Sequence, residues 1–180
     1  MENKSKKKSI IEYNWIFKIV IASFIISVFF SFVSEMAIPN VNIFFSILIA
    51  ILFIVIGVVF DMVGVSVATA DESVYHSMAS KKVKGAKMAI QLKKNASKVS
   101  SFCNDVVGDI CGIVSGSAGA VISIKLSNIM DANNLIITLI VMGIISSLTI
   151  GGKAIFKSFA MKRSNNILYK FASVLSIFKK

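Results

Sequence analysis

Four long apolar segments restrict this chain to a membrane fold. They run from about Tyr13 to Val33, from Val41 to Ala70, from Val99 to Ile124 and from Asn134 to about Ile155. A helix needs roughly 20 mainly apolar residues to cross the hydrocarbon core of a bilayer, and it satisfies its own backbone hydrogen bonds there. The 180 residues are 56% hydrophobic and include one proline. The sequence therefore predicts an all-α integral membrane protein with four transmembrane helices, embedded in the lipid bilayer.

The basic residues predict the orientation of these helices. Of the 20 lysines and arginines, only Lys125 lies outside three segments, which are the amino-terminal segment through Lys18, the loop from Asp71 to Lys98 and the tail from Lys153. Cytoplasmic loops carry an excess of Lys and Arg, so we expect both termini and the middle loop in the cytoplasm of a plasma-membrane protein. The net charge is +11. The basic residues flank the apolar segments, as membrane topology signals do, so this charge does not predict nucleic-acid binding.

The cytoplasmic segments are expected to be helical. In SKKVKGAKMAIQLKK, Val83, Leu92 and either Met88 or Lys87 fall near one face, which predicts a juxtamembrane helix. The tail repeats apolar residues at helical spacing, which predicts a C-terminal amphipathic helix that lies on the membrane surface or packs beneath the bundle. These apolar positions are Ile167, Leu168, Phe171, Val174, Leu175 and Phe178.

Three aspartates lie inside the apolar segments. Asp61 interrupts the second segment, and Asp105 and Asp109 lie one helical turn apart in the third. Ionisable groups in a bilayer are costly and usually face the bundle interior or a water-filled path. Carboxylates that gather must be protonated, paired with a base or bound to a cation. We expect these three to converge near mid-membrane, with Asn104 and the Gly152 carbonyl as additional ligands, although protonated acids that hydrogen-bond between helices remain an alternative.

Oxygen ligands suit hard cations, so Mg²⁺ is the expected ion and Na⁺ is an alternative. Small residues would allow the acid-bearing helices to approach closely. Gly57, Asp61, Gly64 and Ala68 share one face, and Gly108, Gly112 and Gly116 are spaced four apart.

Four segments appear in the order of a known family. They are residues 60–66 (FDMVGVS), 86–92 (AKMAIQL), 103–109 (CNDVVGD) and 152–160 (GKAIFKSFA). They resemble the transmembrane domain of the CNNM/CorC magnesium transporter family, whose motifs are F-S-x-S-E-x-A, A-K-x-A-x-x-L, G-N-N-x-x-N and G-E-x-x-P-K-S-x-A. The resemblance extends from about Phe60 to Phe178, with a short deletion after Asn95. It implies magnesium transport, a homodimer formed through the membrane domain, and ion-facing positions at Asp105 and Asp109.

The chain also departs from the family. Asp61 and Gly64 stand where the family has serine and glutamate, and Lys153 and Phe156 replace a glutamate and a proline. Lys153 could neutralise an acid, but its position favours snorkelling to the interface. We divide the chain into a basic N-terminus with an extra first span (residues 1–40) and a CNNM/CorC-like transmembrane domain (residues 41–180). The family's CBS modules have no counterpart here, so a separate cytoplasmic regulatory partner is conceivable.

Other catalytic or metal-binding patterns are lacking in the sequence. Cys103 and Cys111 are eight apart on one helix, too far for a disulfide, and are interpreted as packing residues. His76 is interpreted as a surface residue. No phosphate-binding loop or nucleophile–base pattern occurs, so we do not expect an enzyme. The leading hypothesis is a cation transporter or ion-binding membrane domain; the alternative is a non-transporting interaction or regulatory subunit.

Overall fold

The computed structural model describes residues 2–178, with the side chains of residue 13 and of residues 15–177. The described part is helical and contains no strand. The predicted position Phe178 has its side chain outside the described part. The helices are α1 (Glu2–Ala37), η1 (Ile38–Asn40), α2 (Ile43–Thr69), α3 (Glu72–Ser80), α4 (Ala86–Lys94), α5 (Ala96–Ser101), η2 (Phe102–Val107), α6 (Gly108–Met130), α7 (Asn134–Lys162) and α8 (Ser164–Phe178).

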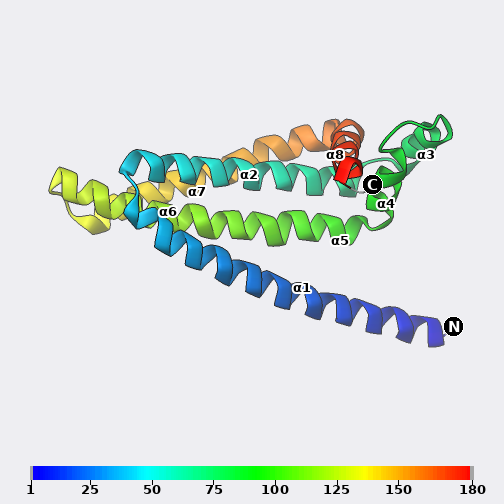
Figure 1. The fold of residues 1–180 in the computed structure, drawn as a ribbon, viewed down its shortest axis with the longest axis horizontal. Coiled ribbons are helices and arrows are strands. Elements are labelled where there is room, and N and C mark those ends of the chain that lie inside the picture. Colours follow the sequence, from blue (N-terminus) through cyan, green and yellow to red (C-terminus); the bar gives the residue numbers. More distant parts are fainter. Residues whose placement is uncertain (1, 179–180) are drawn as a thin grey trace.

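Four helical stretches are long and apolar enough to cross a membrane. They are Trp15–Asn40, Ile43–Thr69, Ala96–Met130 and Asn134–Lys162. The predicted all-α, multi-pass membrane fold is therefore confirmed. The third and fourth stretches extend beyond the predicted bounds, because residues that are too polar for the hydrocarbon core still continue the helix. The start of α1 and the whole of α8 lie at the same end of the bundle as α3 and α4 (Figure 1).

The helices α2, α6 and α7 form the centre of the bundle. Each of the three packs against the other two, whereas α1 packs against α6 and diverges toward its N-terminal end (Figure 1). Glycines allow two of these approaches. A Cβ on Gly57 would lie 3.0 Å from the Cβ of Cys111, and a Cβ on Gly64 would collide with the Asn104 amide. Gly112 and Gly116 have no neighbour within 4 Å of the corresponding position.

The helices α3, α4 and α8 form a platform beneath α2. Their shared core contains Val67, Tyr75, Ala89, Leu168 and Ala172. Of the two predicted positions for the tail helix, the structure has the one beneath the bundle, because Leu168 and Ala172 are fully buried there. The juxtamembrane helix begins at Ala86. Val83 therefore lies in the preceding turn, because Gly85 has a left-handed φ of +82° that interrupts the helix.

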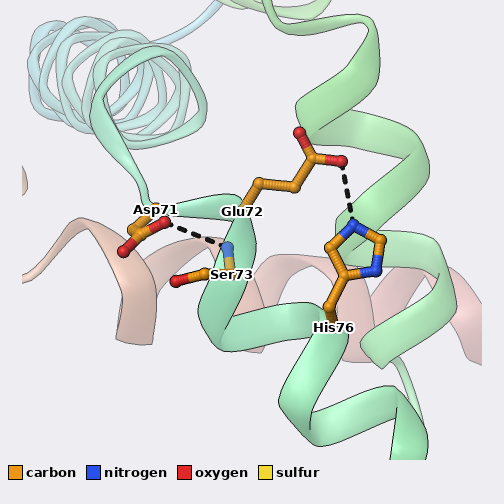
Figure 2. A network of polar contacts seen from close by, with 4 residues as sticks. All are labelled: Asp71, Glu72, Ser73 and His76. Atoms are coloured by element: carbon orange, nitrogen blue, oxygen red, sulfur yellow. Dashed lines mark hydrogen bonds and ion pairs between the residues drawn. The ribbon is translucent and has the colours of Figure 1, made fainter.

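Polar contacts fix this platform to the membrane helices. Lys93 Nζ donates to the carbonyl oxygens of Val67 (3.2 Å) and Ala68 (2.8 Å), which would otherwise be unpaired at the end of α2. Tyr75 Oη donates to the Asn165 carbonyl at 3.0 Å. Figure 2 shows the start of α3, where the Asp71 carboxylate accepts a hydrogen bond from the Ser73 N–H at 3.0 Å.

His76 lies on the next turn of α3 and is exposed. Its Nε2 is 3.2 Å from Glu72 Oε1, and Figure 2 shows this contact as a dashed line. Cys103 and Cys111 are buried and unpaired in the bundle core. The exposed position of His76 and the buried positions of the two cysteines agree with the roles expected from the sequence.

Candidate functional site

A groove lies between α1 and the continuous helix formed by α5, η2 and α6, and apolar side chains such as Trp15, Val20 and Ile113 form much of its wall. Its volume is about 370 Å³. The Asp105 and Asp109 carboxylates line one side together with Ser101, and Ser23 and Ser27 line the α1 side. Both aspartates are exposed within it. The groove therefore places two carboxylates and three hydroxyls, all of them oxygen ligands, between two membrane helices.

The α1 wall of the groove follows from the sequence of the first span. Ser23 and Ser27 are four residues apart, so they lie on one helical face, and the buried Ser34 continues that face toward the opposite end. The other faces of α1 carry exposed aromatic residues, among them Phe24 and Phe32. The helix thus turns hydroxyls toward α6 and aromatic side chains toward the surrounding lipid.

The opposite wall contains an irregular turn. Residues Phe102–Val107 form a π-helix, in which backbone hydrogen bonds run from residue i to residue i+5. Asp105 lies within this turn and Asp109 just after it. Single π-turns inside α-helices are frequently found at functional sites. The sequence has no proline in this helix to cause the irregularity, so no local pattern predicts the turn.

The groove runs along the third apolar span, Ala96–Met130. Lys98 Nζ lies 5.8 Å from the centroid of the Trp15 ring, and Asp109 follows Lys98 by 11 residues, which corresponds to about 16 Å along a helix. Ionised carboxylates within a membrane span are costly, so this pair calls for water, a proton or a cation.

The other three predicted ligands do not line this groove. Asp61 is half-buried on α2. Asn104 contacts Gly64 on α2, and Gly152 contacts Val58, with 3.0 Å between its ideal Cβ position and Val58 Cγ2. No group of three or more His, Cys, Asp or Glu side chains is arranged to hold a metal ion within the described residues. The expected convergence of three carboxylates is therefore not seen there, whereas two of them share one groove.

Helix geometry explains this difference. Asn104, Gly108 and Cys111 occupy the face of the third span that packs against α2 and α7. Asp105 and Asp109 are rotated away from that face, because adjacent residues on a helix differ by about 100°. They face α1 instead. The sequence pattern identified the helices correctly, but it assigned the carboxylates to the interface with α2.

Polar contacts continue along the same α1–α6 interface toward its other end. A second groove of about 430 Å³ is lined by Glu35, Ser117 and Lys125. Ser117 Oγ donates to Glu35 Oε1 at 3.5 Å, and Lys125 Nζ donates to the carbonyl oxygens of Ile38 and Val41. Sequence reasoning missed this set of polar residues. The acid Glu35 at the end of the first span and the lone Lys125 were the signals that could have revealed it.

Lys153 provides one more correction. Its Nζ lies 3.4 Å from the ideal Cβ position of Gly108, so the ammonium group faces the contact between α6 and α7. The expected snorkelling to the membrane interface is not observed. Among the described residues, no carboxylate lies within salt-bridge distance of Lys153.

Comparison with protein-family models, with curated proteins and with solved structures gives no match for this chain. The assignment of a function therefore depends on the groove and on the residues that line it.

Proposed function

We propose that this protein binds a hard cation in the groove between α1 and α6 and moves it across the membrane. Mg²⁺ is the proposed cargo, and Na⁺ is the alternative ion. The observation that carries the proposal is the shared position of Asp105 and Asp109 on one wall of a membrane groove. A divalent cation would neutralise both carboxylates at once, which offsets the cost of placing them in a bilayer.

The composition of the groove suits a partly hydrated ion. Mg²⁺ prefers oxygen ligands, usually one or two carboxylates, and keeps several of its waters. Asp105 and Asp109 would provide the charge, and Ser23, Ser27 and Ser101 would hydrogen-bond to the retained waters. The groove volume of about 370 Å³ leaves room for such waters, since each occupies about 30 Å³ in the liquid.

The resemblance to the CNNM/CorC family supports the same two positions. Asp105 and Asp109 stand at the asparagines that face the ion in that family, and aspartate retains an oxygen ligand while adding charge. The family resemblance also leads us to propose a homodimer and a separate regulatory partner in the cytoplasm. The distribution of Lys and Arg leads us to propose a plasma-membrane location with cytoplasmic termini.

Calorimetric titration of the purified protein with Mg²⁺ tests the proposal. We expect Asp109→Asn and Asp105→Asn each to weaken Mg²⁺ binding at least tenfold while the thermal midpoint changes little. The matched control is Asp131→Asn, because Asp131 is an exposed acid at the end of α6 with φ +49°, a conformation that asparagine adopts readily. Equal Mg²⁺ affinity in the wild type and in both groove variants would refute the assignment.

The second candidate function is a non-transporting interaction or regulatory subunit. The observation that favours it is the exposure of α1, which packs mainly against α6. Proteoliposomes that enclose a Mg²⁺-sensitive dye distinguish the two functions. Mg²⁺ entry that depends on Asp109 supports transport, whereas carboxylate-dependent Mg²⁺ binding without any flux supports the regulatory role.

A further inference from the structure

A basic pocket lies where α7 ends and α8 begins. Its volume is about 230 Å³, and Arg163, Asn166, Tyr169 and Lys170 contribute its polar groups. Phe159 and Ile167 form its apolar wall. The Arg163 guanidinium lies 5.7 Å from the centroid of the Phe159 ring. The pocket therefore combines two cations, an amide and a phenol, all of them donors suited to a phosphate group.

The charge of this pocket has no counter-charge nearby in the sequence. The chain contains no Asp or Glu after Asp131, so the charged residues of α7 and α8 are all basic. No carboxylate lines the pocket. An anion from outside the chain is the natural partner for Arg163 and Lys170.

The position of the pocket corresponds to the lipid headgroups. The helix α7 spans 29 residues, or about 43 Å, which matches the roughly 40–45 Å thickness of a bilayer with its headgroup layers. Arg163 follows the last residue of α7 directly. The outer face of α8 carries apolar residues, with Val174 54% and Ile177 73% exposed. One face of α8 is buried beneath the bundle, and these exposed apolar residues on its other side are available to contact lipid.

A separate apolar groove lies between α2 and α7. It has a volume of about 250 Å³ and is lined by Val55, Val59, Leu148 and Phe156 among others. Phe156 in this groove and Phe159 in the basic pocket are three residues apart, so they lie toward the same face of α7. The groove has the apolar lining that an acyl chain requires.

We propose that these two features together form a binding site for one anionic phospholipid. The headgroup phosphate is held by Arg163, Lys170, Asn166 and Tyr169, and an acyl chain lies in the groove between α2 and α7. Lipid bound in this way would fasten α8 to the end of α7 and hold the platform at the membrane surface. The proposal does not depend on ion transport, because none of these residues belongs to the α1–α6 groove.

Native mass spectrometry of the full-length protein in detergent tests the site. The probes are dioleoyl phosphatidylglycerol, dioleoyl phosphatidylcholine, dihexanoyl phosphatidylglycerol and soluble glycerol phosphate. We expect the wild type to bind dioleoyl phosphatidylglycerol at least tenfold more tightly than either of the other lipids. Millimolar glycerol phosphate should not displace it.

The variants locate the interaction. The double variant Arg163→Gln/Lys170→Gln should abolish the preference for the anionic lipid. Lys170→Gln alone should weaken that preference several-fold, and this single variant keeps the test possible if the double variant does not fold. Lys157→Gln is the matched control, since Lys157 is an exposed lysine on α7 outside the pocket, and it should keep the preference. Equal binding of the anionic and zwitterionic lipids, an unchanged Lys170→Gln variant, or displacement by glycerol phosphate would overturn the proposal.

Discussion

Gly64 is a position where the addition of one methyl group should destabilise the packing of two membrane helices. An ideal Cβ there would collide with Asn104 Oδ1, would lie 2.7 Å from Asn104 Cγ and would lie 3.1 Å from the backbone oxygen of Ser100. The amide side chain could swing away, but the Ser100 carbonyl belongs to the helix itself. Gly64→Ala should therefore force α2 away from α5 and η2.

The magnitude follows from two opposing effects. Overpacking a well-filled interior costs about 1–3 kcal/mol, and the higher helix propensity of alanine returns about 0.8–1.0 kcal/mol. The net effect is a loss of about 0–2 kcal/mol, or up to about 8 °C in the melting temperature for a chain of this size. Gly143→Ala is the matched control. Gly143 has no neighbour within 4 Å, so only the favourable propensity effect applies.

Thermal unfolding of the two variants in the same detergent provides the test. Gly143→Ala should melt at or above the wild-type temperature, and Gly64→Ala should melt below it. Adding Asn104→Ala to Gly64→Ala should recover much of the loss, because it removes the side chain that collides. A Gly64→Ala protein that is as stable as Gly143→Ala would refute the close approach of α2 and η2.

Three further outcomes can be measured. Cysteines placed at Asn40 should react with an impermeant reagent outside the cell, whereas labelling of a cysteine at Lys94 from outside would contradict cytoplasmic termini. Gly112→Leu should reduce the oligomer size in cross-linking if α6 mediates a homodimer, since this exposed glycine has no neighbour within the chain; an unchanged oligomer would exclude that face. Burial, assisted by the Asp71 carboxylate, raises the pKa of Tyr75 from 10.0 to about 12. The neutral Tyr75 phenol therefore stabilises the folded state fully below pH 10, and this stabilisation is lost as the pH rises through 12. Tyr75→Phe should abolish this alkaline loss of stability in unfolding experiments.

The four spans were predictable because bilayer thickness sets a length that the apolar segments meet directly. Helix ends were less predictable. The sequence pattern places Val83 in the juxtamembrane helix, but that helix begins only at Ala86, because Gly85 has a left-handed conformation. Polar residues such as Lys162 continue α7 past the apolar segment, since nothing in their chemistry breaks a helix.

The acids show why a site is harder to derive than a span. Helical spacing placed Asp105 and Asp109 on one face, and they do share one groove. Which neighbour they face depends on how α6 is rotated in the bundle, and the side chains of several helices decide that together. The contact of Gly57 with Cys111 is one of those that set the rotation, and this long-range contact leaves no local pattern in the sequence.

The same rotation gives the first span a structural role in the proposed site. Once Gly57 and Lys153 hold one side of α6 against α2 and α7, Asp105 and Asp109 must face either lipid or another helix. The serine face of α1 lies opposite them across the groove, and Glu35 meets Ser117 further along the same interface. Without α1, two carboxylates within a membrane span would face hydrocarbon, at a cost of several kcal/mol for each ionised group. The span that lies outside the family resemblance thus provides one of the two walls on which the proposed cation binding depends.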